Sequence, residues 1–356
     1  MLALSRRLVL QNTLSIYTTI AAAMTTSSSA LNASTTSCSA LSTNILQQYP
    51  IGLGTLDIPR DSMSRVIRQA VEIGYRRIDC APVYFNEDAV GDALAESIQD
   101  GLVQRSDLYL VSKLASPFHR KEHVELALRK TLNDLRIDYL DLYLIHWPVA
   151  FQYVPIDPAV RGYPDEAIDD SGDGLRIDPT VSIHETWQAM EALVDKGLVR
   201  EIGVSNFPVS LLHELLARSR ITPAVNQCEG HPYLQQPHLL KYCQARGVHY
   251  QAYSPLGTPG YKEEGEPAVL EDPVLQNIGR RHNNASAAQV CLAWALQRGT
   301  SGVAKTVTEQ RLRENLAAAQ IELTDEEMQE IAQLDRNHRF FRPQDWWPEM
   351  PVAVFD

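Results

Sequence analysis

Short apolar runs and longer stretches with apolar residues at helical spacing alternate along the chain from residue 49 onward. A short apolar run predicts a buried strand, and an apolar period of roughly 3.6 residues predicts an amphipathic helix. The predicted strands are residues 50–54, 76–80, 108–113, 139–145, 200–204, 223–227, 248–252 and 302–306. The predicted helices are residues 61–73, 87–98, 119–134, 183–196, 208–218, 235–245, 286–297 and 308–317. This alternation indicates a parallel sheet, and eight such units close a (β/α)8 barrel.

An open, doubly wound sheet is the alternative to a closed barrel. The dinucleotide-binding version of that sheet carries Gly-x-Gly-x-x-Gly after its first strand, whereas here Gly52 and Gly54 lack the third glycine. The sequence therefore favours an α/β fold of the (β/α)8 TIM barrel type. Two connections, 147–182 and 254–285, are long for a compact domain, as is typical of functional loops. We expect both to be long loops at the rim of the barrel.

The first 48 residues differ in composition from the rest of the chain. Arg6 and Arg7 are the only charged residues before Asp57, and one nineteen-residue stretch contains twelve serines and threonines. Such a segment cannot bury much apolar surface, so we predict a disordered leader. Its arginines, its hydroxyl groups and its lack of acids resemble a mitochondrial or plastid transit peptide more than a secretory signal. The alternative is an inert leader, with Met24 as the true start and a cytoplasmic location.

The chain is therefore expected to have three parts. Residues 1–48 are predicted as the leader, 49–335 as the catalytic barrel and 336–356 as a C-terminal tail over the active site. The tail is rich in aromatic residues, namely Phe340, Phe341, Trp346 and Trp347. These side chains can pack against the rim of the barrel and complete a substrate pocket.

Composition excludes several classes of function. The formal net charge is −12 without a basic patch, so a nucleic-acid partner is not expected. No apolar run is long enough to span a membrane. The five cysteines are scattered and form no Cys-x-x-Cys pair, which argues against a disulfide framework or a structural zinc site. A metal-dependent hydrolase on the same barrel is disfavoured as well, because no His-x-His pair ends a strand, and we expect no metal.

Polar side chains follow several predicted strands at their carboxyl ends, where barrel enzymes carry their chemistry. Asp79, Lys113 and His146 end three successive strands, and Tyr84 follows the first of them. Together they form an acid–base set: a nearby ammonium lowers the pKa of a phenol, a carboxylate holds that ammonium, and an imidazole orients a carbonyl. Taken singly, a Lys–Asp pair is more often a structural salt bridge, and a lone histidine a satisfied polar group. Only their joint placement favours catalysis.

A second set of polar residues spans the last predicted strand and helix. Lys305 and Thr306 end the strand, Thr308 can cap the helix, and Arg311 and Asn315 follow on one helix face. A helix N-terminus flanked by lysine and arginine suits an anion, and a phosphate monoester is a natural guest. The alternative is an ordinary capped helix with solvated basic residues.

Six stretches resemble the aldo-keto reductase superfamily, in particular the aldose and aldehyde reductases, over about residues 48–340. They are R-R-I-D-C-A-P-V-Y-F-N-E-D (76–88), L-Y-L-V-S-K-L (108–114), D-L-Y-L-I-H-W-P (141–148), I-G-V-S-N-F (202–207), N-Q-C-E-G-H-P-Y-L (226–234) and Q-A-Y-S-P-L-G (251–257). The resemblance implies a barrel enzyme that binds NADPH and moves a hydride to or from a carbonyl. It also implies Tyr84 as general acid, tuned by Lys113 and Asp79, with His146 orienting the substrate.

The same resemblance implies the remaining site residues. The cofactor-binding residues would be Thr55, Ser205, Asn206, Gln227, Tyr253, Ser254, Leu256, Lys305, Thr306, Arg311 and Asn315. In this set, Ser205, Asn206 and Gln227 would hold the nicotinamide carboxamide, and Tyr253 would stack on its ring. Ser254 and Leu256 would form the pyrophosphate loop, and the last four residues would bind the 2′-phosphate and adenine. The substrate-binding residues would be Leu56, Trp147, Trp346 and Trp347.

The sequence departs from the superfamily pattern at four positions. Leu56 replaces a common tryptophan over the substrate pocket, which puts the shape of the substrate in doubt. Ala304 and Thr306 replace the more usual proline and serine before and after Lys305, and Gly230 replaces a common cysteine. His146, in place of the glutamate of members that reduce carbon–carbon double bonds, favours carbonyl reduction.

We therefore predict NADPH-dependent reduction of an aldehyde or ketone, with sugars among the candidates. The alternative is an NADPH-binding regulatory or redox-sensing subunit whose turnover is incidental. The expected partner is a small carbonyl compound, and the expected state is a monomer, with a dimer as the alternative.

Overall fold

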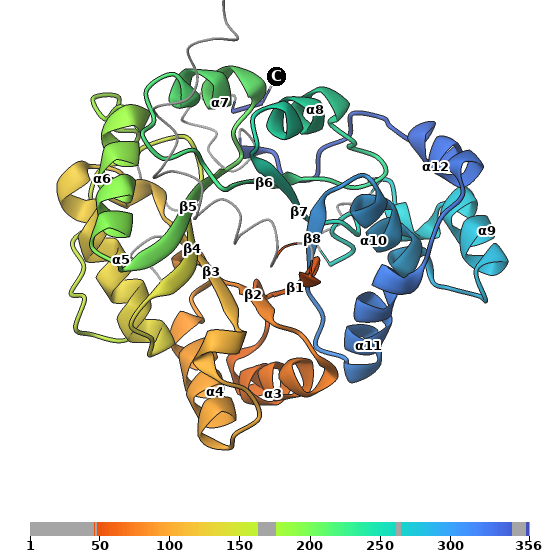
Figure 1. The fold of residues 1–356 in the computed structure, drawn as a ribbon, viewed down its shortest axis with the longest axis horizontal. Helices are drawn as coiled ribbons and strands as arrows, with labels where there is room; N and C mark the ends of the chain where they lie inside the picture. Colours follow the sequence, from red (N-terminus) through yellow and green to blue (C-terminus); the bar gives the residue numbers. More distant parts are fainter. Residues whose placement is uncertain (1–45, 47, 163–175, 261–264, 344–353, 356) are drawn as a thin grey trace, which may run out of the picture. The chain divides into compact units, whose positions relative to one another are not determined.

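The computed structural model describes residues 46, 48–162, 176–260, 265–343, 354 and 355. Within these residues, eight parallel strands form a closed barrel in sequence order, and β8 pairs with β1 to close it (Figure 1). The strands are β1 (Ile51–Gly54), β2 (Arg77–Asp79), β3 (Tyr109–Leu114), β4 (Leu140–Ile145), β5 (Val199–Ser205), β6 (Val225–Glu229), β7 (His249–Tyr253) and β8 (Ser301–Ala304). The predicted (β/α)8 barrel is thus confirmed.

Ten α-helices surround the barrel in the described part of the chain. They are α3 (Met63–Ile73), α4 (Glu87–Gln99), α5 (Lys121–Leu135), α6 (Ile183–Asp195), α7 (Val209–Leu216), α8 (Pro237–Ala245), α9 (Pro273–Arg281), α10 (Ala287–Gln297), α11 (Glu309–Ala317) and α12 (Asp325–Ala332). All eight predicted helices are present with small changes at their ends. Two helices, α9 and α12, were not expected.

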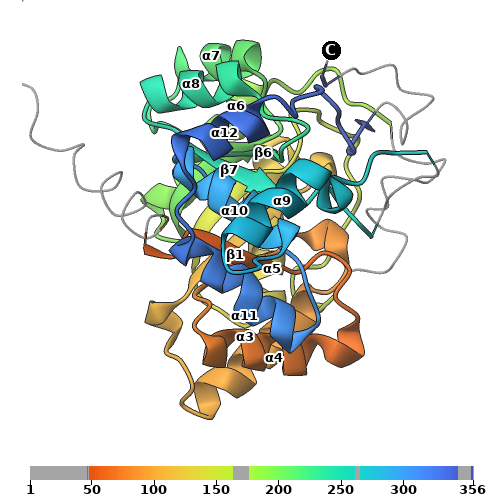
Figure 2. The same ribbon diagram turned by 90° about the vertical axis from the view of Figure 1, so that its right-hand side faces the viewer.

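Helix α9 corrects the prediction that 254–285 is a loop throughout. Its start carries the usual signals, because the Asp272 side chain accepts the N–H of Val274 and Pro273 occupies the first turn. Leu275 and Ile278 are fully buried. The surrounding Gly, Pro and Glu residues obscured this short apolar stripe. The helix lies outside α10, away from the strands (Figures 1 and 2).

Helix α12 also has a clear start in the sequence. The Thr324 side chain accepts the N–H of Glu327, and the Glu327 side chain accepts the N–H of Thr324. This reciprocal capping box is recognisable from Thr-x-x-Glu alone. It was overlooked because the (β/α)8 count was already complete at residue 317.

The core lies mainly between the outer face of the strands and the helices. In α3, Val66, Ile67, Ala70 and Val71 are buried on one stripe. Gly74 ends this helix with φ 117°, a left-handed conformation that costs glycine no strain. Helical spacing in the sequence therefore identifies the side of the helix that faces the strands.

A smaller apolar cluster fills part of the barrel interior. Leu46 is 1% exposed and belongs to the same cluster as Tyr109, Val111, Leu142, Leu144 and Val225, which come from β3, β4 and β6. Nearby, the Arg77 side chain donates a hydrogen bond to the carbonyl of Tyr49. The packed domain therefore includes Leu46, which the composition of the sequence assigned to the leader.

Leu46→Ala is expected to lower the free energy of unfolding by about 2–5 kcal/mol, because it leaves a cavity among buried leucine and valine side chains. Urea denaturation of the variant and of the unchanged chain measures this difference. Val160, 58% exposed, provides the control: Val160→Ala should change stability by less than about 0.5 kcal/mol. Equal stability of the Leu46 variant and the unchanged chain would show that this contact does not support the domain.

Strand β8 is shorter at its carboxyl end than predicted. It ends at Ala304, so Lys305 and Thr306 begin the connection to α11 instead of ending the strand. Parallel pairing of β1 with β8 also stops at Ala304, opposite Leu53. Among the described residues, no helix is long and apolar enough to cross a membrane, and no cluster of potential metal ligands occurs.

Candidate active site

The predicted acid–base residues meet at the carboxyl end of the barrel. Asp79 ends β2, Lys113 is the penultimate residue of β3, and His146 directly follows β4. A single 3-10 turn, Pro82–Tyr84, places the phenol of Tyr84 beside them. Asp79, Tyr84 and His146 line a cavity of about 430 Å³. Strand order thus brings together residues from three separate segments of the chain.

Lys113 has a partner for each of its three N–H groups. Its Nζ donates to Asp79 Oδ1 at 2.5 Å, to the carbonyl of Cys80 at 2.8 Å and to the Tyr84 hydroxyl at 3.1 Å. The side chain is buried, so water does not compete for these hydrogen bonds. Lys113 is therefore held as a fixed positive charge next to the phenol oxygen.

The electrostatics of the phenol differ from the prediction. Burial raises the pKa of Tyr84 above its ordinary value, and Lys113 offsets only part of that increase. Burial alone would lower the pKa of Lys113, but the Asp79 charge and the Tyr84 hydroxyl raise it above the ordinary value instead. The expected net decrease in the phenol pKa was therefore wrong. At neutral pH the phenol carries its proton, as a proton donor must.

The His146 ring also lies beside the Tyr84 ring. The two ring centroids are 6.1 Å apart and the ring planes are nearly perpendicular, at 80°. Burial lowers the pKa of His146 well below its ordinary value, and the positive charge of Lys113 lowers it further. The imidazole is therefore neutral at neutral pH, and one ring nitrogen can donate a hydrogen bond to a carbonyl oxygen.

The residues expected to hold a nicotinamide form a connected wall. Ser205 Oγ donates to the Gln227 carbonyl at 2.8 Å, and Tyr253 donates to Asn206 Oδ1 at 2.9 Å. Asn206 Nδ2 in turn donates to the carbonyl of His146 at 2.9 Å. All four side chains line the cavity. This wall therefore presents amide and hydroxyl groups beside an aromatic ring.

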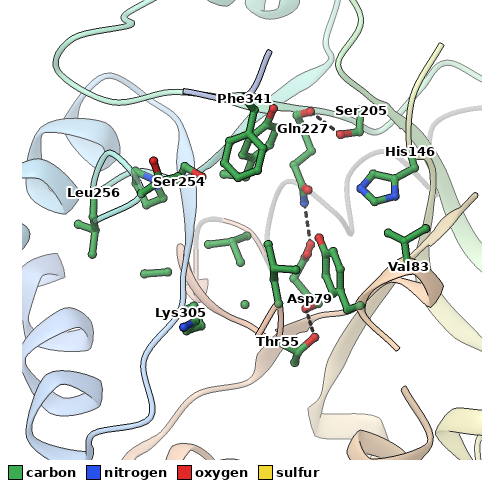
Figure 3. Close-up of a pocket in the computed structure, with 18 of the residues that line it drawn as sticks. Thr55, Asp79, Val83, His146, Ser205, Gln227, Ser254, Leu256, Lys305 and Phe341 are labelled. Carbon is green, nitrogen blue, oxygen red and sulfur yellow. Dashed lines mark hydrogen bonds between the residues drawn. The ribbon is translucent and has the colours of Figure 1, made fainter. Parts of the chain in front are cut away.

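Gln227 also contacts the Asp79 carboxylate, which the sequence did not reveal. Its Nε2 donates to Asp79 Oδ2 at 2.6 Å, while Oδ1 of the same carboxylate accepts from Lys113. Figure 3 shows Gln227 pointing toward Asp79, with Ser205 and His146 on the same side of the cavity. Asp79 thus joins the acid–base residues to the wall expected to hold the cofactor.

The opposite side of the cavity suits a phosphate group. Ser254, Leu256 and Lys305 line it (Figure 3). Ser254 and Thr258 adopt positive φ, 49° and 44°, and Gly257 between them has φ 70°. Such turns direct backbone N–H groups into an anion-binding concavity. The buried Thr258 hydroxyl also lines the cavity and lacks a hydrogen-bond partner among the described residues, so this side has unused polar capacity.

Thr258 was missed in the sequence because the matched stretch stopped at Gly257. Its signal is conformational: Thr258 combines a positive φ with a buried hydroxyl at the cavity, and strain of this kind is a feature of many functional sites. The loop that carries it thus offers hydroxyl and N–H donors, while Lys305 supplies a positive charge. This donor set fits a pyrophosphate between the two ends of the cavity.

The residues expected to bind the 2′-phosphate and adenine lie beside the cavity, not in its wall, apart from Lys305. Thr306 and Asn315 are buried, whereas Arg311 is exposed in the first turns of α11. Thr308 makes no capping hydrogen bond with its side chain in the described chain, which corrects the prediction. Instead, the Thr306 hydroxyl accepts the Thr308 N–H at 3.2 Å. Thr306 therefore orders the start of this helix.

The predicted substrate-binding residues Leu56 and Trp147 both line the cavity with apolar side chains. Thr55 also lines it, and its hydroxyl donates to the Asp79 carbonyl. Trp346 and Trp347 lie outside the described residues. Among the described residues of the tail, Phe341 lines the cavity, and it was not assigned to the site.

Comparison with known proteins places this geometry in a family. Residues 50–336 match the Aldo/keto reductase family. An aldo/keto reductase of Synechocystis sp. is 45% identical over 314 residues, which cover 86% of this chain and 92% of that protein. The NADPH-dependent D-xylose reductase of Meyerozyma guilliermondii is 40% identical over 310 residues, covering 85% of this chain and 96% of that protein.

A solved structure supports the same family assignment. The aldose reductase from Schistosoma japonicum superposes with a TM-score of 0.74 at 37% sequence identity, covering 84% of this chain and 92% of that chain. The matched region contains the barrel, all four acid–base residues and every cavity-lining residue except Phe341. The chain therefore belongs to the aldo/keto reductase family.

Proposed function

We propose that this protein is an NADPH-dependent reductase of aldehydes or ketones, including sugars in their open-chain form. The observation that carries the proposal is the position of the Lys113 ammonium, which hydrogen-bonds both Asp79 and the Tyr84 hydroxyl at the cavity. The relative from Meyerozyma guilliermondii supports NADPH as cofactor and a sugar as substrate, since its name states NADPH and D-xylose.

Tyr84 acts as the general acid. Its phenol is protonated at neutral pH and faces the cavity, so it can protonate a carbonyl oxygen as that oxygen becomes negative. Lys113 stabilises the resulting phenolate through the existing hydrogen bond. Asp79 keeps Lys113 in place. Neutral His146 donates a second hydrogen bond to the same carbonyl oxygen and fixes its orientation.

NADPH, when bound, supplies the hydride that is added to the carbonyl carbon. Ser205, Asn206 and Gln227 would hold the carboxamide end, and Tyr253 would offer its ring as a stacking surface. Ser254, Leu256 and Thr258 would bind the pyrophosphate. Lys305, Thr306, Arg311 and Asn315 would hold the 2′-phosphate and the adenine.

Arg311→Ala is expected to weaken NADPH binding by about tenfold or more, the usual effect of losing a charge-assisted hydrogen bond to phosphate. NADH lacks the 2′-phosphate, so its affinity should stay close to that of the unchanged protein. Fluorescence titration with each cofactor measures both affinities. Arg313→Ala is the control, since Arg313 lies on the same helix and pairs with Glu309. Equal losses of affinity for NADPH and NADH would mean that the 2′-phosphate binds elsewhere.

The proposed function is tested by the loss of NADPH absorbance with the full chain and a panel of aldehydes, ketones and sugars. Turnover of at least one carbonyl compound is expected. The ranking of the compounds by rate would indicate the size and polarity of the substrate pocket. Tight NADPH binding without turnover of any carbonyl would contradict the proposal. It would favour a regulatory or redox-sensing subunit instead.

A further inference from the structure

A buried carboxylate at the barrel rim has no part in the acid–base chemistry. Glu229 ends β6, two residues after Gln227, and is 0% exposed. A carboxylate is costly to bury unless donors surround it. The donors here are the His231 ring nitrogen at 2.9 Å and the backbone N–H groups of Phe340 and Phe341 at 2.8 and 3.1 Å.

Most of these donors belong to the C-terminal tail. Besides the two N–H groups, the Arg339 guanidinium lies 3.7 Å from Glu229 Oε2. Just before it, the N–H groups of Arg336 and His338 both donate to the carbonyl of Tyr233. The tail is therefore attached along residues 336–341 to the segment that follows β6. Glu229 is the charged end of this attachment.

The attachment determines where Phe341 lies. Phe341 lines the cavity (Figure 3). It meets the Tyr253 ring edge to face, with ring centroids 5.5 Å apart and ring planes at 88°. Tyr253 donates to Asn206, which contacts the carbonyl of His146. Because Glu229 accepts the N–H of Phe341 itself, the carboxylate fixes the backbone from which this side chain projects.

We propose that Glu229 is a positioning residue that holds the tail so that Phe341 forms an apolar wall selecting carbonyl substrates by size and polarity. The proposal rests on the proposed reductase function. A large aromatic aldehyde fills the cavity and contacts this wall, whereas a small polar aldehyde reacts at Tyr84 without reaching it. Loss of Glu229 therefore impairs binding of the first substrate and spares turnover of the second.

The test compares Glu229→Gln with the unchanged full chain, using 4-nitrobenzaldehyde and glyceraldehyde. The expected result is a KM for the aromatic aldehyde raised on the order of tenfold, as for a lost apolar contact, with kcat for glyceraldehyde unchanged. Phe341→Ala should raise the same KM. Adding Glu229→Gln to Phe341→Ala should raise the KM for the aromatic aldehyde little further, since both changes disrupt the same wall.

Hydrogen–deuterium exchange gives a readout that does not depend on activity. The amides of residues 340 and 341 should exchange slowly in the unchanged protein and much faster in Glu229→Gln, because their acceptor is weakened. Glu201→Gln is the matched control: Glu201 is also buried, but it accepts from Tyr109 far from the tail. A change in the aromatic KM as large in Glu201→Gln as in Glu229→Gln would mean general destabilisation and overturn the proposal.

An unchanged rate of amide exchange at residues 340 and 341 in Glu229→Gln would also overturn the proposal. If Glu229→Gln does not fold, Phe341→Ala decides instead, and an unchanged KM ratio between the two aldehydes rejects the proposal. Absence of turnover in the unchanged protein would reject the reductase function, and with it the selection of carbonyl substrates. The exchange experiment would then still report whether Glu229 holds the tail.

Discussion

Replacing Tyr84 with phenylalanine is expected to reduce kcat for carbonyl reduction by about 10²–10⁴-fold, the usual contribution of a positioned general acid. The ring remains, so the cavity keeps its shape and NADPH binding should be unchanged. The variant loses only the hydroxyl that accepts from Lys113 and donates to the substrate. Initial rates of NADPH oxidation with a saturating aldehyde, together with fluorescence titration of NADPH, measure the two effects separately.

The control is Tyr75→Phe. Its hydroxyl is also buried and donates to the carbonyl of Leu312, but it lies outside the cavity, between α3 and α11. This variant should lose some stability and keep its activity. Should Tyr84→Phe retain most of the activity, another group would be the acid, and the role of Lys113 would have to be revised.

The fold was predictable because a barrel repeats one simple pattern. Each strand is a short apolar run, and each following helix has a stripe such as Val66, Ile67, Ala70 and Val71 in α3. The extra helices were not predictable by counting units, since neither α9 nor α12 belongs to the eightfold repeat. Both have capping signals, at Asp272 and at Thr324, that identify them without reference to the repeat.

Part of the site was predictable for the same reason. Residues at the carboxyl ends of parallel strands converge, so Asp79, Lys113 and His146 meet although they come from three separate segments. Contacts between these residues and others depend on side-chain conformation. Spacing in the sequence predicts neither the hydrogen bond from Gln227 to Asp79 nor the one from the Phe341 N–H to Glu229.

The pKa of Tyr84 shows the limit of reasoning from pairs of residues. The sequence suggested Lys113 as a neighbour and correctly predicted that its charge lowers the phenol pKa. Burial acts in the opposite direction and is the larger effect, but it is set by every residue around the phenol. The net direction thus depends on the completed cavity and not on the motif.

Lys113→Met is expected to cause large losses of both stability and activity. The change leaves Asp79 buried without its charge partner, so the free energy of unfolding should fall by about 3–5 kcal/mol. Carbonyl reduction should also fall by about 10²–10⁴-fold, because nothing then stabilises the phenolate of Tyr84. Urea denaturation and initial rates measure the two losses.

Adding Asp79→Asn to Lys113→Met separates these two losses. The neutral pair removes the unpaired buried charge, and the asparagine oxygen can still accept from Gln227, so much of the lost stability should return. Activity should not return, since the ammonium next to the Tyr84 hydroxyl is still missing. If activity recovered together with stability, Lys113 would serve the fold alone, and the phenol would not need a neighbouring charge.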